Sequence, residues 1–236
     1  MKPYCIIAAR GGSKRIINKN IIKVSNKHII SYPISCALKS KLFKEVFVTT
    51  DSKKISTISK KNGANVPFLR NKKLANDKVG LQEVIVDFIK KQKLENEKFI
   101  VFIYATAILI TKQMLNKAIK KFQITDSDFM IGVQEFKSNP LRAFEIKNNQ
   151  LRFVNSIYSK ENTQNLKKFY HDAGSFFIFK TSTIMKSSFK LPKKTTYYLH
   201  KKFEVCDIDD TEDLEFAKII LENKKNNKKM TQVTAA

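Results

Sequence analysis

The sequence predicts an α/β fold in which a largely parallel sheet is covered by helices on both faces. Short apolar runs suited to buried strands alternate along the chain with segments that have the periodicity of amphipathic helices. Such alternation is typical of parallel sheets, whose strands are buried on both faces and are therefore apolar throughout. A chain of 236 residues with 42% hydrophobic content is long enough to bury one sizeable core.

The first part of the chain contains two strand candidates and two helix candidates. Asp51 and Ser52 follow the second apolar run, and either residue is suited to cap a helix. The expected elements are strands at 4–9 and 46–50, a helix at 29–40, a capped helix that ends near residue 61, and an extended segment at 64–69.

The middle of the chain continues the alternation. Apolar residues recur at helical spacing between residues 81 and 89, and Thr111 is suited to cap a further helix with an apolar inner face. The run at 99–104 is expected to form a buried strand, and the run at 129–133 another. These elements extend the predicted sheet.

The pattern weakens between residues 138 and 170. Segments 142–146 and 150–154 are suited to a small hairpin that turns at Asn148 and Asn149. We interpret residues 138–170 as an excursion from the main sheet and as a candidate oligomerisation arm.

Regular structure returns after this excursion. Residues 174–179 predict a strand, and residues 207–213 lead into a last helix with one apolar face. We therefore predict a single α/β domain over residues 1–225, which includes the excursion, and a flexible tail at 226–236.

The strong positive charge does not by itself indicate nucleic-acid binding. The formal net charge is +24, but only five of the 45 basic residues are Arg. Surfaces that bind nucleic acid usually cluster Arg with Lys in a stripe, whereas this chain scatters Lys throughout. We therefore expect no nucleic-acid partner, and we expect the few Arg residues to lie where a planar, forked donor is needed.

The cysteines and the apolar runs favour a cytoplasmic protein. Cys5, Cys36 and Cys206 are far apart and form no C-x-x-C pair, so neither a disulfide framework nor a zinc site is expected. The first apolar stretch ends at Arg10 and does not resemble a signal peptide. The longest run, 99–110, is too short to span a bilayer, so no membrane contact is expected.

The stretch AARGGSKRIINKN, which follows the first expected strand, combines backbone freedom with positive charge. A glycine-containing loop at a strand end can present N–H groups to an anion, and basic side chains add charge-assisted hydrogen bonds. These properties suit a triphosphate, although the spacing is that of neither a Walker A loop nor a dinucleotide fingerprint. A basic surface loop is the alternative. The candidate phosphate-binding residues are Arg10, Gly11, Gly12, Ser13, Lys14 and Lys19.

Two acidic residues near the last helix are candidate metal ligands. Asp207 and Asp209 alternate along an extended segment, so both side chains can point to one face. Two carboxylates are a normal protein contribution to a Mg²⁺ site whose other ligands are water and phosphate oxygens. The alternative is that these acids cap the helix, as Asp210 is suited to do. Glu204 lies close by in the sequence and is a less suitable candidate.

Several motifs, in the same order along most of the chain, resemble those of the sugar-acid cytidylyltransferases, the CMP-sialic acid synthetase family. They are A-R-x-x-S-K-x-x-x-x-K-N at 9–20, V-T-T-D-S at 48–52, P-F-L-R at 67–70 with L-A-N-D at 74–77, Y-A-T-A at 104–107, T-Q-N-L at 163–166 with Y-H-D-A-G-S-F at 170–176, and D-I-D at 207–209 with D-L at 213–214. The Y-H-D-A-G segment resembles most the branch that acts on pseudaminic acid.

The resemblance implies a Rossmann-like fold of the nucleotide-diphospho-sugar transferase type, a homodimer and a set of site residues. It implies that Arg10, Lys14 and Lys19 bind the leaving pyrophosphate and that Asp209 serves catalysis. It favours Mg²⁺ as the cofactor on Asp207 and Asp209. The other CTP-binding residues would be Ala9, Asn20, Arg70, Tyr104 and Thr106, and the sugar-binding residues would be Gln164, His171, Asp172 and Gly174.

Alternatives remain for some of these residues. Arg70 is also compatible with a surface position at a turn, and His171 with an ordinary half-buried histidine. The chain departs from the family pattern at four positions: Ile17, Ala105 and Ile108 stand where the family has prolines, and Ser175 stands where it has a glutamine. Because of these departures, the alternative remains that the protein binds a nucleotide sugar without catalysing the reaction.

The sequence thus predicts an enzyme that transfers CMP from CTP to a nine-carbon 2-keto sugar acid, with pseudaminic acid the first choice. The anomeric hydroxyl is expected to attack the α-phosphorus in line and to displace pyrophosphate, with positioning and charge neutralisation supplying most of the catalysis. The alternatives are the same reaction on sialic, legionaminic or 3-deoxy-octulosonic acid, and, in another class, a basic nucleic-acid-binding protein.

Overall fold

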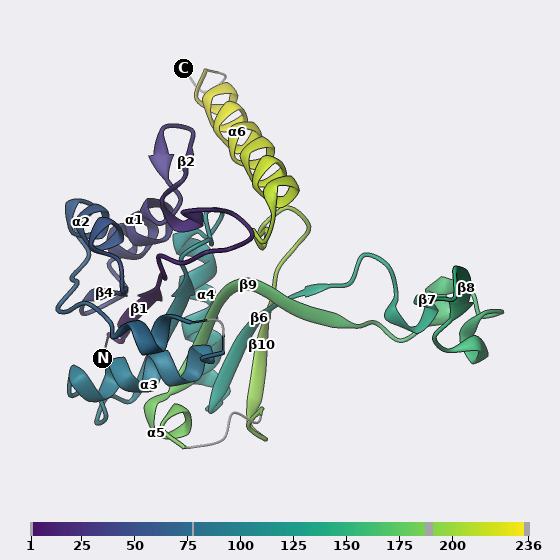
Figure 1. The fold of residues 1–236 in the computed structure, drawn as a ribbon, viewed down its shortest axis with the longest axis horizontal. Helices are drawn as coiled ribbons and strands as arrows, with labels where there is room; N and C mark the ends of the chain where they lie inside the picture. Colours follow the sequence, from purple (N-terminus) through teal and green to yellow (C-terminus); the bar gives the residue numbers. More distant parts are fainter. Residues whose placement is uncertain (1, 77, 187–190, 234–236) are drawn as a thin grey trace.

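The computed structural model describes residues 2–76, 78–186 and 191–233, and it confirms the α/β prediction (Figure 1). Asp77, which belongs to the motif at 74–77, lies outside the described residues. No helix in the described part of the chain is long and apolar enough to cross a membrane.

A six-stranded sheet forms the centre of the fold. Its strands are β1 (Tyr4–Ala8), β4 (Val46–Thr49), β5 (Phe99–Tyr104), β6 (Phe129–Glu135), β9 (Tyr170–Lys180) and β10 (Thr195–Leu199). Their order across the sheet is β10-β6-β9-β5-β1-β4. The strand β1 pairs in parallel with β4 and β5, and β10 pairs in parallel with β6, whereas β9 runs antiparallel to both of its neighbours. The sheet is therefore mostly parallel, as predicted.

Six helices accompany the sheet among the described residues, and two of them begin at the predicted caps. They are α1 (Ser31–Ser40), α2 (Lys53–Lys61), α3 (Leu81–Lys91), α4 (Lys112–Ile124), α5 (Thr181–Ile184) and α6 (Thr211–Val233). Of the two candidates before α2, Ser52 is the cap, because its Oγ accepts a hydrogen bond from the backbone N–H of Ile55 at 3.4 Å. Thr111 caps α4 in the same way.

The core lies on both faces of the sheet because successive strand residues point to opposite sides. In β1, Cys5 and Ile7 belong to the cluster that also contains apolar residues of α1 and α4. Ile6 points the other way, into the cluster that contains residues of α3 and α5. The helices thus cover opposite faces of the sheet, with α3 and α5 lying together on one side in Figure 1.

The segment between β6 and β9 leaves this body, and we call residues 138–170 the arm. It carries the predicted hairpin, formed by β7 (Phe144–Lys147) and β8 (Gln150–Phe153). Asn148 and Asn149 make the turn with φ values of 51° and 61°, which suits a tight hairpin. Figure 1 shows the arm projecting from the rest of the fold.

Other parts of the chain differ from the predictions. The edge strand β10 and a short hairpin of β2 (Lys23–Val24) and β3 (Lys27–His28) were not expected. The last helix continues to Val233, so residues 226–233, where a flexible tail was predicted, are helical. The physical reason is that residues 211–233 contain neither Gly nor Pro to end the helix. Residues 234–236 lie outside the described part.

Candidate active site

The predicted phosphate loop and the predicted acidic pair meet at one cavity. The cavity has a volume of about 420 Å³ and lies where the parallel strands β1 and β5 end, the usual position for ligands of such sheets. The predicted site residues that line it are Arg10, Lys19, Asn20, Arg70, Tyr104, Thr106, Asp207 and Asp209. We call it the nucleotide cavity. Residues from opposite ends of the sequence therefore form one site.

The loop after β1 also encloses a smaller hollow beside the nucleotide cavity. This hollow has a volume of about 340 Å³ and is lined by Arg10, Ser13, Lys14, Arg15, Lys19 and Asn20. The buried side chain of Asn20 donates from Nδ2 to the carbonyl oxygen of Arg10 at 3.0 Å, so it closes the loop on itself. The concentration of basic side chains around one hollow suits a group with several negative charges, such as a triphosphate.

The small residues of this loop have different surroundings. The Ala9 side chain is buried in the core, and its backbone N–H donates to the carbonyl oxygen of Thr49. Ala9 therefore fixes the start of the loop to the sheet. Gly11 donates its N–H to the Asp51 carboxylate at 3.0 Å, whereas Gly12 faces open space. Neither glycine is among the residues that line the two cavities.

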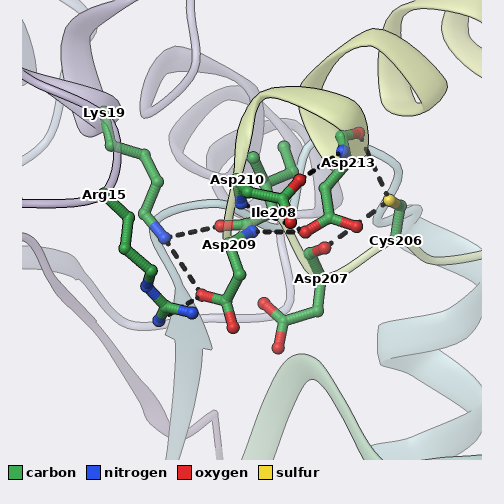
Figure 2. Close-up of polar contacts among 8 residues, drawn as sticks. All are labelled: Arg15, Lys19, Cys206, Asp207, Ile208, Asp209, Asp210 and Asp213. Atoms are coloured by element: carbon green, nitrogen blue, oxygen red, sulfur yellow. Dashed lines mark hydrogen bonds and ion pairs between the residues drawn. The ribbon is translucent and has the colours of Figure 1, made fainter. Parts of the chain in front are cut away.

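The carboxylates of Asp207 and Asp209 point to the same side of their segment, as the alternation predicted (Figure 2). Asp209 Oδ1 accepts hydrogen bonds from Arg15 Nη2 at 2.8 Å and from Lys19 Nζ at 3.3 Å. Lys19 Nζ also donates to the carbonyl oxygen of Ile208, which fixes the basic loop against the acidic segment. Burial raises the pKa of Asp207, and the nearby charge of Asp209 raises it further.

Asp210 and Asp213, and not Asp207 and Asp209, are the acids whose side chains cap the last helix. Asp210 Oδ1 accepts from the backbone N–H of Asp213 at 2.9 Å, which is the geometry of an N-cap. Asp213 Oδ2 in turn accepts from the backbone N–H groups of Asp209 and Asp210. Figure 2 shows this reciprocal pair beside the acidic segment. The side chains of Asp207 and Asp209 are therefore not needed as caps and face the cavity.

The donor set of the acidic pair fits a hard divalent cation such as Mg²⁺. Asp207 and Asp209 offer carboxylate oxygens at the wall of the nucleotide cavity, and such oxygens are the ligands that Mg²⁺ prefers. The described residues contain no group of three or more His, Cys, Asp or Glu side chains placed to hold a metal ion.

Gly174 lies directly against Asp207. It adopts a left-handed conformation with φ of +58°, and a Cβ atom added to it would lie 2.4 Å from Cγ of Asp207. Its backbone N–H donates to Asp172 Oδ1 at 2.9 Å. Here β9 shifts its register against β6, since Ile131 and Val133 of β6 pair with Phe177 and Asp172. Gly174 thus makes room for Asp207.

A second and larger cavity adjoins the nucleotide cavity at Leu81 and Tyr104, which line both. Its volume is about 700 Å³, and most of its lining is apolar, from α3, β9 and α5. Asp172 also lines it, and its Oδ2 accepts a hydrogen bond from the Tyr104 hydroxyl at 3.3 Å. The pKa of Asp172 and that of Tyr104 are both raised, chiefly because the surrounding protein displaces water. We call this space the side cavity.

Of the four predicted sugar-binding residues, only Asp172 lines one of these cavities. Gln164 belongs to the 3-10 turn Thr163–Asn165 in the arm, which projects away from the body (Figure 1). The ring of His171 packs against Phe136 at 4.9 Å, and its Nδ1 lies 2.8 Å from the carbonyl oxygen of Asp172. Gln164, His171 and Gly174 are not among the residues that line the nucleotide cavity or the side cavity.

The structure adds two residues that the sequence analysis did not assign to the site. Arg15 lines the smaller hollow beside the nucleotide cavity and pairs with Asp209. The scarcity of Arg in this chain was a signal that could have identified it. Asp51 contacts Gly11 and lies 3.7 Å from Arg70 Nη2. Arg70 itself is only 5% exposed, so the alternative that places it at the surface is wrong.

The fold and this site define a nucleotidyltransferase. A basic, glycine-containing loop after the first strand faces an acidic pair across a cavity at the carboxyl end of a mostly parallel sheet. A family model described as cytidylyltransferase matches residues 4–232. The chain therefore belongs to the cytidylyltransferase family.

Similar proteins agree with this assignment. The pseudaminic acid cytidylyltransferase of Campylobacter jejuni is 38% identical over 223 residues, which cover 93% of this chain and 96% of that protein. The CMP-N,N'-diacetyllegionaminic acid synthase of the same species is 30% identical over 225 residues, covering 92% and 94%. A solved structure of CMP:2-keto-3-deoxy-manno-octonic acid synthetase complexed with CTP superposes with a TM-score of 0.69 at 13% identity, covering 95% of this chain and all of that one. This last likeness confirms the nucleotide-diphospho-sugar transferase type of fold.

Proposed function

We propose that this enzyme transfers CMP from CTP to a nine-carbon 2-keto sugar acid, with pseudaminic acid as the first choice, and releases pyrophosphate. The observation that carries the proposal is the meeting of Arg10 and Lys19 with Asp207 and Asp209 around one cavity. The similarity to a pseudaminic acid cytidylyltransferase over nearly the whole chain supports the choice of sugar acid.

In this proposal the basic loop binds the triphosphate. Arg10, Lys14 and Lys19 would hold the β- and γ-phosphates and stabilise the charge that develops on departing pyrophosphate. Asp207 and Asp209 would hold Mg²⁺, which supplies charge neutralisation at the phosphate oxygens. Lys19 lines the smaller hollow and also donates a hydrogen bond to Asp209, so it would hold the basic loop and the acidic pair in a fixed relative position.

The side cavity is the space we propose for the sugar acid. It meets the nucleotide cavity at Tyr104, so a hydroxyl of a bound sugar could reach the α-phosphate from that side. Asp172 would face the sugar at this junction. The largely apolar lining suits a sugar acid that carries acyl groups in place of some hydroxyls, because unpartnered hydroxyls are costly to bury.

The direct test incubates purified protein with CTP, Mg²⁺ and separate sugar acids, and measures pyrophosphate release. We expect release with pseudaminic acid and slower or no release with sialic, legionaminic and 3-deoxy-octulosonic acids. Release with another member of this panel would correct the substrate. CTP binding without release from any of them would instead identify a nucleotide-sugar binder.

The role of the acidic pair can be tested with two neighbouring substitutions. Asp209→Asn should remove Mg²⁺-dependent turnover, because it removes one of the two proposed metal-binding charges. Asp210→Asn is the matched control, since it makes the same charge change one residue away and Asn is also a good N-cap. Equal turnover in the two variants would contradict the metal-binding role of Asp209.

We further propose a homodimer that uses the arm. Three large apolar side chains of the arm, Ile146, Leu151 and Ile157, are 76%, 65% and 79% exposed, an arrangement that suits contact with a second copy. If Gln164 contacts the sugar acid, as the family resemblance implies, it does so in the site of the second copy, because the arm carries it away from its own. Light scattering on the purified protein would measure the oligomeric state.

We also propose a cytoplasmic location, because the three cysteines are free and such thiols are usual in a reducing compartment. Fractionation of cells that express the protein would test this location, and recovery with the membrane or outside the cell would contradict it.

A further inference from the structure

Asp51 lies between the two cationic segments of the site, directly after β4. Its Oδ1 accepts a hydrogen bond from the backbone N–H of Gly11 at 3.0 Å. The same oxygen lies 3.7 Å from Nη2 of Arg70. The side chain of Asp51 is 17% exposed and that of Arg70 is 3% exposed, so the pair is largely shielded from water. One carboxylate therefore connects the phosphate loop to a buried guanidinium.

The guanidinium of Arg70 needs such a partner. Its Nε makes no hydrogen bond in the described structure, and burying an unpaired charge is costly. Burial lowers the pKa of Arg70 and the nearby charge of Arg10 lowers it further, whereas Asp51 acts in the opposite direction. Without the Asp51 charge, Arg10 and Arg70 would repel each other across the cavity that both line.

The backbone around Asp51 is itself fixed by the sheet. The N–H of Arg70 donates to the carbonyl oxygen of Thr50 at 2.7 Å, which places the arginine beside the end of β4. Gly11 approaches the same segment closely, since a Cβ atom added to it would lie 3.0 Å from Cβ of Ser52. The Asp51 carboxylate is therefore held on a rigid element and can set the position of both partners.

We propose that Asp51 is a positioning residue, which holds the phosphate loop through Gly11 and holds Arg70 through its charge so that both face the nucleotide. Asp51 is not among the residues that line the nucleotide cavity, so it acts through these two partners and not by contact with the ligand. The inference rests on the proposed function, because it assumes that the ligand of this cavity is CTP.

The test measures CTP affinity and steady-state kinetics for Asp51→Ala and Asp51→Asn. The alanine variant loses both the acceptor for Gly11 and the charge near Arg70, so its Kd and KM for CTP should rise about tenfold or more, with kcat at saturating CTP little changed. A tenfold change corresponds to about 1.4 kcal/mol. The asparagine variant keeps an acceptor oxygen and loses only the charge, so its KM should lie between those of the wild type and Asp51→Ala.

Two further comparisons distinguish a positioning role of Asp51 from a general effect of removing a negative charge near Arg70. Asp87→Asn removes another carboxylate that acts electrostatically on Arg70, but Asp87 pairs with Lys91 on α3. This variant should keep the wild-type KM. In a double-mutant cycle with Arg70→Ala, the loss caused by Asp51→Ala should be smaller than in the wild-type background.

The outcomes are distinguishable from failure of the proposed function. If the wild-type enzyme does not bind CTP, the proposed function is wrong and this inference with it. If the wild type binds CTP and both Asp51 variants keep its KM, Asp51 is not a positioning residue. Equal losses in Asp51→Asn and Asp87→Asn, or strictly additive losses with Arg70→Ala, would also overturn the inference. Thermal unfolding of the near-isosteric Asp51→Asn variant checks that the protein is folded in each assay.

Discussion

Replacing Gly174 with alanine should lower turnover about a hundredfold while the protein stays folded. The new Cβ would lie 2.4 Å from Cγ of Asp207 and 2.6 Å from its Oδ1, whereas carbon atoms in ordinary contact are about 3.5–4.0 Å apart. Asp207 would therefore have to move by about 1 Å. A displacement of this size at a reacting centre typically costs about a hundredfold in rate.

The backbone conformation adds a separate and smaller cost. Gly174 has φ of +58°, and an alanine in this left-handed region costs about 1–2 kcal/mol. Gly63 supplies the matched control, because it also has a positive φ, of +88°, but an added Cβ would meet only Cδ1 of the Leu38 side chain, at 3.1 Å. Gly63→Ala should thus lose similar stability and keep its turnover.

The assay compares both variants with the wild type. Chemical denaturation gives the loss of unfolding free energy, and pyrophosphate release from CTP and a sugar acid gives the turnover. We expect both variants to lose about 1–2 kcal/mol, and only Gly174→Ala to lose about a hundredfold in turnover. Turnover of Gly174→Ala within threefold of the Gly63→Ala value would refute the reasoning, because Asp207 would then not depend on the missing side chain.

Further predictions concern His200, Ser52 and the arm. Burial lowers the pKa of His200 to about 4, below its unfolded value of 6.5, so its contribution to stability is present above pH 6.5 and is lost as the pH falls toward 4. The loss should be about 3 kcal/mol, and urea titrations of His200→Gln should lack this pH dependence. Ser52→Ala should cost about 1 kcal/mol of unfolding free energy through the lost cap of α2, with unchanged stability as the contrary result. Ile146→Ser with Leu151→Ser should convert the proposed dimer to a folded monomer in light scattering, and a persistent dimer would exclude this hairpin as the contact.

The sequence predicted the helices and strands well where local rules determine them. The strand β5 is a continuous apolar run, and α4 has both a Thr cap and an apolar face, so periodicity and capping were sufficient. The edge strand β10 was missed because its residues are half-exposed and mix Thr with Tyr, which leaves no apolar run.

Contacts between distant parts of the chain were less predictable. Family motifs indicated Arg10, Lys19 and the acidic pair, and the structure brings these residues to one cavity. No local pattern, however, indicates that Asp51 accepts a hydrogen bond from Gly11, because that contact depends on the parallel pairing of β1 with β4. The position of Gly174 against Asp207 likewise depends on a register shift that only the assembled sheet defines.

The strand order has a consequence for how the chain folds during synthesis. The strands β1, β4 and β5 can pair with one another as soon as they have emerged, but both neighbours of β6 come later in the chain. Until the arm and β9 have been made, β6 has no partner and β5 has an open edge, and unpaired edges invite aggregation. In the sheet, β9 lies between β6 and the group formed by β5, β1 and β4. A chain whose synthesis stops within the arm would therefore have β6 unpaired and the edge of β5 exposed. Slow translation of the arm is therefore expected to be more harmful than slow translation of α6, which follows the completed sheet.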